Sequence, residues 1–176
     1  NVDEVTRRDL TQSETIKRNF EIIEILTSEY TSVFYVDLTT QRVASYRMDS
    51  DAQKLFGQQK IQWEITYESL LERYTREFVQ PQSREELLEA GAAAQIRKAL
   101  TDRKSININY LSSKGHYCEA RFVKVGDGKP SAVALGFADR DTEIRNEQQR
   151  QKQLEEARTR AESANEAKSR FLFNMS

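Results

Sequence analysis

The residues that could carry covalent chemistry are few in this chain. Its 176 residues include a single histidine, His116, and a single cysteine, Cys118. A hydrolytic triad needs a histidine held beside a nucleophile and an orienting acid, and the residues around His116 do not predict that arrangement. One cysteine excludes an intrachain disulfide and a multi-cysteine metal site. Because the sequence also lacks the glycine-rich phosphate-binding motifs, we predict no catalytic residue and no metal site.

The composition narrows the class of protein. Lys and Arg number 27 against 28 Asp and Glu, so the net charge of −1 gives no indication of a nucleic-acid partner. Charged residues make up 31% of the chain, and long solvated helices outside a core would explain that share. No apolar run approaches membrane-spanning length. We expect a cytoplasmic location for this stretch, while a membrane anchor elsewhere in its parent protein stays an open alternative.

Residues 1–29 are expected to form an amphipathic helix. Phe20, Ile23 and Leu26 give its second half an apolar face, and helix breakers are few. A dimer-forming signalling helix and an ordinary surface helix fit this pattern equally well.

The first half of the following segment predicts a hairpin and then helices. Residues 32–48 are dense in β-branched and aromatic residues, as is typical of paired strands. Helical spacing follows over 63–79, and Pro81 ends that helix because proline disfavours helical geometry in the residue before it. Ser83 offers a capping box with Glu86 for a further helix.

The second half predicts three more strands. Buried and exposed positions alternate over 104–111, 116–125 and 131–138. Small residues occupy one face of the last of these strands, and the N-terminal helix is the candidate to pack on it. We therefore expect an α+β domain over 30–141, with a five-stranded antiparallel sheet, helices on one face, and a signalling helix on each side in sequence.

This order of elements resembles a PAS domain, and the resemblance covers residues 30–141. Residues 79–85, VQPQSRE, are similar to a turn found in one PAS subfamily, although two positions of that turn differ. Asp139, Arg140 and Asp141 resemble the triplet that closes many PAS domains and leads into a signalling helix. The resemblance implies a role in signal transmission for these three residues.

The resemblance also implies a place for a ligand between helices and sheet. Five side chains could line a pocket for an unknown small molecule or could simply fill the core: Tyr67, Tyr74, Ile108, Tyr110 and Phe122. Haem-binding PAS domains carry an axial His on a helix, and flavin-adduct PAS domains carry a helical Cys. Since His116 and Cys118 fall at or within a predicted strand, haem and covalent flavin are not expected, and no cofactor is evident.

Residues 142–176 predict one long helix with a coiled-coil seam. Steps of three and four residues connect the seam positions, which are Leu154, Ala157, Ala161 and Ala164, with Phe171 and Met175 in phase further on. The seam changes phase between Ile144 and Leu154, as in a stutter. We expect a parallel homodimer through this seam, and a single solvated helix is the alternative.

The end of this helix carries a second resemblance. Residues 167–176, AKSRFLFNMS, resemble the lead-in to the phosphoacceptor box of sensor histidine kinases, in which His-Glu follows and the His takes phosphate from ATP. The sequence stops one residue before such a His would stand. The resemblance therefore implies a longer parent kinase, simple or hybrid, although the chain itself is not expected to be an enzyme.

Together these patterns favour the sensory module of a two-component histidine kinase that controls autophosphorylation through a coiled-coil helix. The implied partner of the parent is a response regulator or receiver domain. Two alternatives stay open: a ligand-free PAS dimerisation scaffold, and the PAS module of a cyclic-dinucleotide signalling protein.

Overall fold

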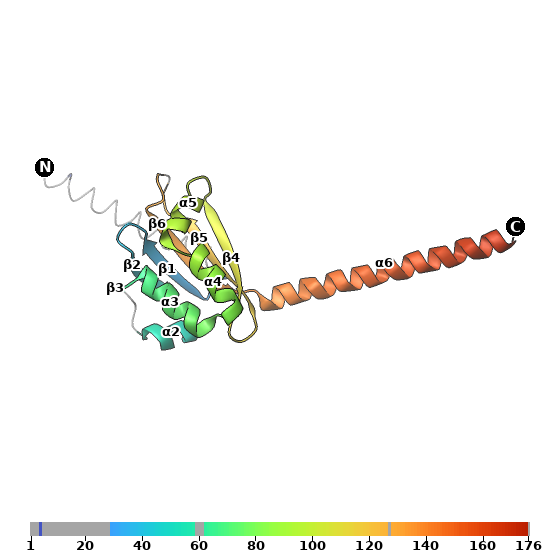
Figure 1. Ribbon diagram of the computed structural model, residues 1–176, viewed down its shortest axis with the longest axis horizontal. Coiled ribbons are helices and arrows are strands. Elements are labelled where there is room, and N and C mark those ends of the chain that lie inside the picture. Colours follow the sequence, from blue (N-terminus) through green and yellow to red (C-terminus); the bar gives the residue numbers. More distant parts are fainter. Residues whose placement is uncertain (1–3, 5–28, 59–61, 127, 176) are drawn as a thin grey trace. The chain divides into compact units, whose positions relative to one another are not determined.

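The computed structural model describes residues 4, 29–58, 62–126 and 128–175 (Figure 1). The N-terminal helix expected over 1–29 lies outside these residues, apart from residues 4 and 29. The chain divides into two compact units at Asp139/Arg140. We call the described part of the first unit, 29–139, the sheet domain. The boundaries expected from the sequence, at 29/30 and 141/142, stay predictions.

A single antiparallel sheet organises the sheet domain. Its order is β3-β2-β1-β6-β5-β4, and each neighbouring pair is antiparallel. The strands are β1 (Ser32–Asp37), β2 (Arg42–Arg47), β3 (Gln62–Thr66), β4 (Ser105–Leu111), β5 (Tyr117–Lys124) and β6 (Ala132–Asp139).

Four helices lie on one face of this sheet (Figure 1). They are α2 (Ser50–Phe56), α3 (Tyr67–Phe78), α4 (Pro81–Ala90) and α5 (Ala93–Ala99). Three of them contribute buried side chains to the core cluster, including Leu70 from α3, Leu87 from α4 and Ile96 from α5, and Phe56 of α2 packs against this cluster. The α+β class is confirmed, and so is the PAS-like order of two strands, helices and three strands, except that β3 lies between α2 and α3.

The alternation in the last three strands sets which side chains face the helices. Ile108 and Tyr110 of β4 are buried, while Asn107 and Asn109 between them are exposed. Phe122 on β5 and Leu135 on β6 are 0% exposed and pack in the same cluster. A period of two therefore places one face of the sheet in the core.

The opposite face of β6 carries small residues, as expected. Gly136 lies under the ring of Tyr30, and a Cβ atom there would come within 2.7 Å of the ring. Tyr30 packs in a second cluster with Val33 and Ala138. A glycine is needed here because no side chain fits between strand and ring. The packing expected for the N-terminal helix on this face lies outside the described residues.

The sheet has six strands rather than the five expected, because the first residues of the helix predicted over 63–79 form a strand. Gln62–Thr66 instead form the edge strand β3, which pairs with β2 through Arg42↔Thr66 and Ala44↔Gln62. The helix begins only at Tyr67, where the Thr66 side chain caps it by accepting from the Ser69 amide at 3.2 Å. Trp, Ile and Thr favour strands, and an N-cap decides where the helix starts.

The capping box predicted at Ser83 is also wrong. Helix α4 already begins at Pro81, with Gln80 at the cap position. Proline suits the first helical position, because the N–H it lacks would have no helical partner there. Ser83 lies inside the helix, and its hydroxyl accepts from the Leu111 amide at 3.3 Å.

The second unit is a continuous helix, α6 (Asp141–Met175), of 35 residues with no buried side chain. It contains the segment expected to be helical from residue 142. Arg158–Glu162 and Glu166–Arg170 form i,i+4 ion pairs along it, at 3.2 and 3.9 Å. Among the described residues, no helix is both long enough and apolar enough to cross a lipid bilayer.

Candidate functional site

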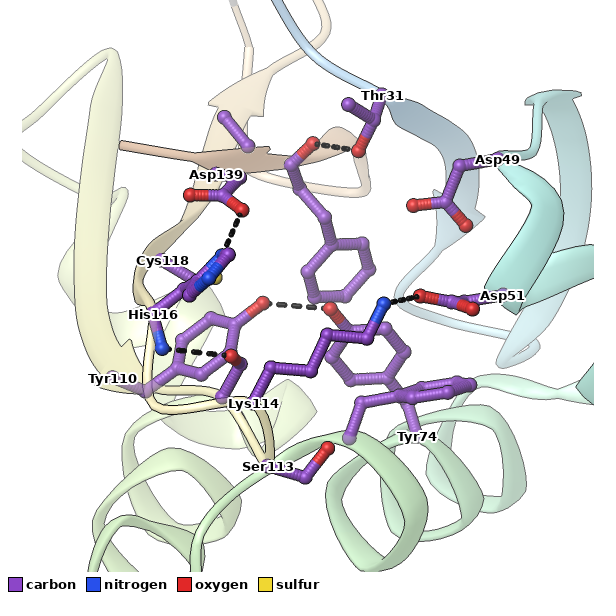
Figure 2. Close-up of a pocket in the computed structure, with 14 residues that line it drawn as sticks. Thr31, Asp49, Asp51, Tyr74, Tyr110, Ser113, Lys114, His116, Cys118 and Asp139 are labelled. Atoms are coloured by element: carbon purple, nitrogen blue, oxygen red, sulfur yellow. Dashed lines mark hydrogen bonds and ion pairs between the residues drawn. The ribbon is translucent and has the colours of Figure 1, made fainter. Parts of the chain in front are cut away.

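A cavity of about 90 Å³ lies where β6 ends in the sheet domain. The start of α2, the last turns of α3, the turn between β4 and β5 and the end of β6 surround it (Figure 2). Four segments that are distant in the sequence thus meet around one small space.

Aromatic rings form one part of the cavity wall. Tyr74 stacks on Phe137 with ring centroids 4.2 Å apart, and Tyr110 meets Tyr74 edge to face at 6.3 Å. The hydroxyls of Tyr74 and Tyr110 are 2.7 Å apart and share a hydrogen bond. Burial raises the pKa of both hydroxyls, and the charge of Asp49 acts in the same direction. Both tyrosines therefore stay neutral donors at ordinary pH.

Lys114 and Asp51 lie on the other side, at the rim. The Lys114 side chain extends over the cavity to Asp51, with Nζ 3.1 Å from Oδ2 (Figure 2). The hydrogen bond and charge of Asp51 raise the pKa of Lys114, and the charges of Asp49 and Asp139 act in the same direction. The rim therefore favours positive charge.

Asp49 is held in place by the helix that it caps. Its Oδ1 accepts from the Ala52 amide at 2.8 Å, and its own amide donates to the Ser32 hydroxyl at 3.0 Å. Capping places a carboxylate at the start of α2, where the helix dipole favours negative charge.

His116 and Asp139 close the cavity on the β6 side. His116 Nδ1 lies 2.7 Å from Asp139 Oδ2, and both side chains are roughly half exposed. The sequence pattern predicted His116 at the edge of a strand, with no catalytic arrangement around it. The structure shows that the Asp139 carboxylate is its partner. The contact joins the β4–β5 turn to the end of β6.

The turn that carries Lys114 and His116 is fixed by its own backbone. Gly115 has φ +79, a conformation that favours glycine, and its amide donates to the Ser112 carbonyl at 2.8 Å. The Ser113 amide donates to the Phe78 carbonyl at 2.8 Å, which ties the turn to the end of α3. The two basic side chains thus project from an anchored turn.

The five pocket candidates do not lie together around one cavity. Tyr74 and Tyr110 line the cavity at the end of β6. Ile108 and Phe122 belong to the core cluster, with Phe122 0% exposed. Tyr67, 1% exposed, also packs in that core; its hydroxyl donates to the Gly91 carbonyl, and it borders a separate groove of about 450 Å³ between α3 and the segment 88–94.

The three transmission candidates fall on both sides of the unit boundary. Asp139 is the last residue of β6 and pairs with His116. Arg140 pairs with Glu143 at 3.4 Å, and Asp141 pairs with Arg145 at 2.8 Å in the first turn of α6. The Asp141 carboxylate also lies at the helix N-terminus, where negative charge is stabilising.

The six seam candidates are exposed in α6: Leu154, Ala157, Ala161, Ala164, Phe171 and Met175. Leu154 is 61% exposed, Phe171 60% and Met175 71%. Their helical state was predicted, and the second helix expected to pack on this seam stays a prediction.

Sequence reasoning missed Asp49, Asp51 and Lys114. Asp49 had a readable signal, since Asp before a short helix is a common N-cap. Asp51 and Lys114 are 63 residues apart, and no local pattern connects them. Among the described residues, no group of three or more His, Cys, Asp or Glu side chains is arranged to hold a metal ion.

No family model matches the chain, and no curated protein matches it. Among solved structures, it is similar to a sensory box histidine kinase/response regulator from Burkholderia thailandensis E264, at 18% identity and a TM-score of 0.43, over 79% of this chain and 97% of that chain. It is also similar to an RNA-binding light-oxygen-voltage receptor, at 14% identity and a TM-score of 0.46, over 74% of this chain and 34% of that chain.

A third similar structure is the N-terminal domain of a diguanylate cyclase with PAS/PAC sensor from Marinobacter aquaeolei. It shares 16% identity and a TM-score of 0.39, over 64% of this chain and 97% of that chain. At these identities and TM-scores, the similarities carry no conclusion about what this chain binds or does.

Proposed function

We propose that this chain is the sensory and regulatory module of a two-component histidine kinase. In this proposal the sheet domain receives a signal, and α6 carries it to the phosphoacceptor segment of the parent protein. Control of autophosphorylation is the output. A response regulator or receiver domain is the partner of the parent kinase.

The observation that carries this proposal is the character of α6. It runs as one helix of 35 residues into the kinase-like sequence AKSRFLFNMS, and none of its side chains is buried. Phe171, Leu172 and Phe173 are 60%, 56% and 81% exposed. Large apolar side chains gain free energy by burial, so this segment is suited to pack against another helix.

We assign the packing partner to a second copy in parallel. The seam steps from Leu154 through Ala157, Ala161 and Ala164 by three and four residues, as in a heptad repeat. The next step of four reaches Lys168. A polar residue at a seam position costs stability but fixes the register between two identical helices. Small alanines pack weakly, which keeps such a dimer adjustable.

The signal route is proposed to run through the segment Asp139-Arg140-Asp141. Asp139 ends β6 and pairs with His116, whereas Asp141 starts α6 and pairs with Arg145. One residue thus separates two carboxylates with different partners. A change at the end of β6 reaches the first turn of the helix through three residues of backbone.

Phosphate labelling tests the proposal. The chain alone is expected to take up no phosphate from ATP. A longer protein, in which the chain continues through a phosphoacceptor histidine and an ATP-binding domain, is expected to label on that histidine. Absence of labelling in the longer protein, with its fold intact by circular dichroism, would contradict the kinase assignment.

The ligand-free scaffold is a second candidate, and the packed interior favours it. Tyr67, Phe122 and Leu135 occupy the space between helices and sheet, each 1% exposed or less. Native mass spectrometry of the purified protein separates the candidates, since a bound metabolite excludes the scaffold. The cyclic-dinucleotide alternative is disfavoured by the kinase-like sequence of residues 167–176.

A further inference from the structure

The cavity at the end of β6 is acidic. Three carboxylates border it, those of Asp49, Asp51 and Asp139, and they face one ammonium, Lys114, and one imidazole, His116. Three carboxylates against one ammonium leave an excess of two negative charges, before any charge on the imidazole is counted. A concave site with charges of one sign in excess attracts counter-ions of the other sign. Electrostatics therefore favours a cation here.

Aromatic rings accompany the carboxylates. Tyr74, Phe78, Tyr110 and Phe137 all line the same cavity. The negative faces of such rings attract ammonium groups, and aromatic surroundings are a recurring feature of sites for organic ammonium ligands. The combination of rings and carboxylates suits an organic cation better than a hydrated inorganic one, because the ring faces offer no oxygen ligands to a metal and the two tyrosine hydroxyls already bond each other.

The size of the cavity limits the ligand. About 90 Å³ is available. A dry apolar cavity of ~150 Å³ accepts benzene with its six non-hydrogen atoms, so this space suits a molecule of roughly three or four non-hydrogen atoms. The shared hydrogen bond between the Tyr74 and Tyr110 hydroxyls adds a polar point of contact within it.

We propose that this cavity binds a small organic cation, a protonated amine of up to about four non-hydrogen atoms, that replaces the Lys114 ammonium beside Asp51. The Lys114 ammonium already occupies the position that the ligand's ammonium would take. Lys114 Nζ lies 3.1 Å from Asp51 Oδ2, and its side chain spans the rim (Figure 2). The side chain is 67% exposed, so it can move away at little cost in buried area.

The protonation behaviour of Lys114 agrees with this assignment. Asp51 raises its pKa most, and Asp49 and Asp139 both add to the effect. All three carboxylates therefore stabilise a positive charge at this point. The same three carboxylates would repel an anionic ligand, so the site disfavours a carboxylate or phosphate ligand.

Binding here does not require that the protein be a kinase module. It would place the ligand against Asp139, the last residue of β6, and so at the point where the sheet domain leads into the following segment. Loss of kinase labelling and loss of cation binding are separate results, and each can fail alone.

Titration followed by NMR tests the proposal. The whole chain, labelled with ¹⁵N, is titrated with trimethylammonium chloride and, in parallel, with methylammonium chloride. Sodium acetate and sodium chloride at equal ionic strength serve as controls. The amides of Ser113, Gly115 and Cys118 are expected to shift with the ammonium salts and to stay in place with the controls.

Two variants with opposite expected effects sharpen the test. Lys114→Gln removes the competing ammonium and is expected to tighten binding by about two- to fivefold, the range that an exposed ion pair is worth. Asp51→Asn removes the acceptor and is expected to weaken binding by about tenfold. Glu68→Gln, at the separate groove beside Tyr67, is the matched charge control and is expected to change nothing.

The outcomes divide cleanly. Shifts with ammonium salts, strengthened by Lys114→Gln, support the proposal. No shifts with either ammonium salt in the wild type and in Lys114→Gln overturn it, as do shifts caused by acetate at the same amides. If Asp51→Asn does not fold, Lys114→Gln alone decides, because its expected effect is a gain.

Discussion

The sheet domain buries most of its large apolar side chains, whereas α6 exposes them. In the sheet domain, Phe122 and Leu135 are 0% exposed. In α6, Phe171 and Phe173 are 60% and 81% exposed, and no residue is buried. Most helical stability in proteins comes from packing an apolar face. The sheet domain supplies its own stabilising contacts, whereas we propose that α6 gains them from a second chain. On that proposal, the difference separates a part with its own core from a part that depends on assembly.

The largest expected effect is on the core of the sheet domain. Phe122→Ala leaves a cavity among fully buried neighbours, and the free energy of unfolding is expected to fall by about 3–5 kcal/mol. Val123→Ala, one position along β5 and 38% exposed, is the matched control and is expected to cost less than about 1 kcal/mol. Urea unfolding monitored by circular dichroism measures both. Equal losses would mean that the core is not packed as described.

Alkaline pH is expected to act on the same core. Burial raises the pKa of Tyr67, Tyr74 and Tyr110 above the ordinary 10.0. Because the folded-state pKa is the higher one, this stabilisation is complete below about pH 10 and is lost as the pH rises toward the folded-state values. The ultraviolet absorbance of phenolate should show these three tyrosines ionising only as the domain unfolds. Ionisation of all tyrosines in one step before unfolding would contradict their burial.

The third prediction concerns α6. Leu154→Lys places a charge in the expected seam and should weaken dimerisation by about tenfold or more, while the unfolding of the sheet domain changes by less than about 0.5 kcal/mol. Thr159→Lys introduces the same charge on the opposite side of the helix and serves as the control. Sedimentation equilibrium gives both dissociation constants. A monomeric wild-type chain would support the single solvated helix instead.

How much of this could be read from the sequence differs between the two parts. The alternation of Ile106, Ile108 and Tyr110 was enough to predict β4 and its buried face. The strand β3 was missed because Tyr67, Leu70 and Tyr74 follow helical spacing, and the predicted helix was extended back to residue 63. Short apolar segments do not distinguish the two periods.

The cavity was beyond sequence reasoning for a different reason. Tyr74 and Tyr110 were named as pocket candidates, but their charged neighbours come from elsewhere in the chain. Asp51 and Lys114 meet only because the β4–β5 turn is tied to the end of α3. Such a contact depends on the folded sheet rather than on any local pattern.

A small effect on stability is expected at the end of β6. Asp139→Ala removes an exposed pair with His116, and the free energy of unfolding is expected to change by less than about 1 kcal/mol. In the longer kinase, the same change is expected to remove the response of labelling to the signal. A large fall in melting temperature would instead give Asp139 a structural role.

The central claim is that α6 carries the state of the sheet domain to the phosphorylation step, and insertions into the helix test it directly. Seven residues inserted after Arg150 keep a heptad seam in phase, whereas two residues rotate it by about 200°. Phosphate incorporation by the longer kinase should stay within about twofold of the wild type with seven added residues and change by about tenfold with two. Equal labelling in both insertion variants, at the wild-type rate, would contradict transmission through the helix.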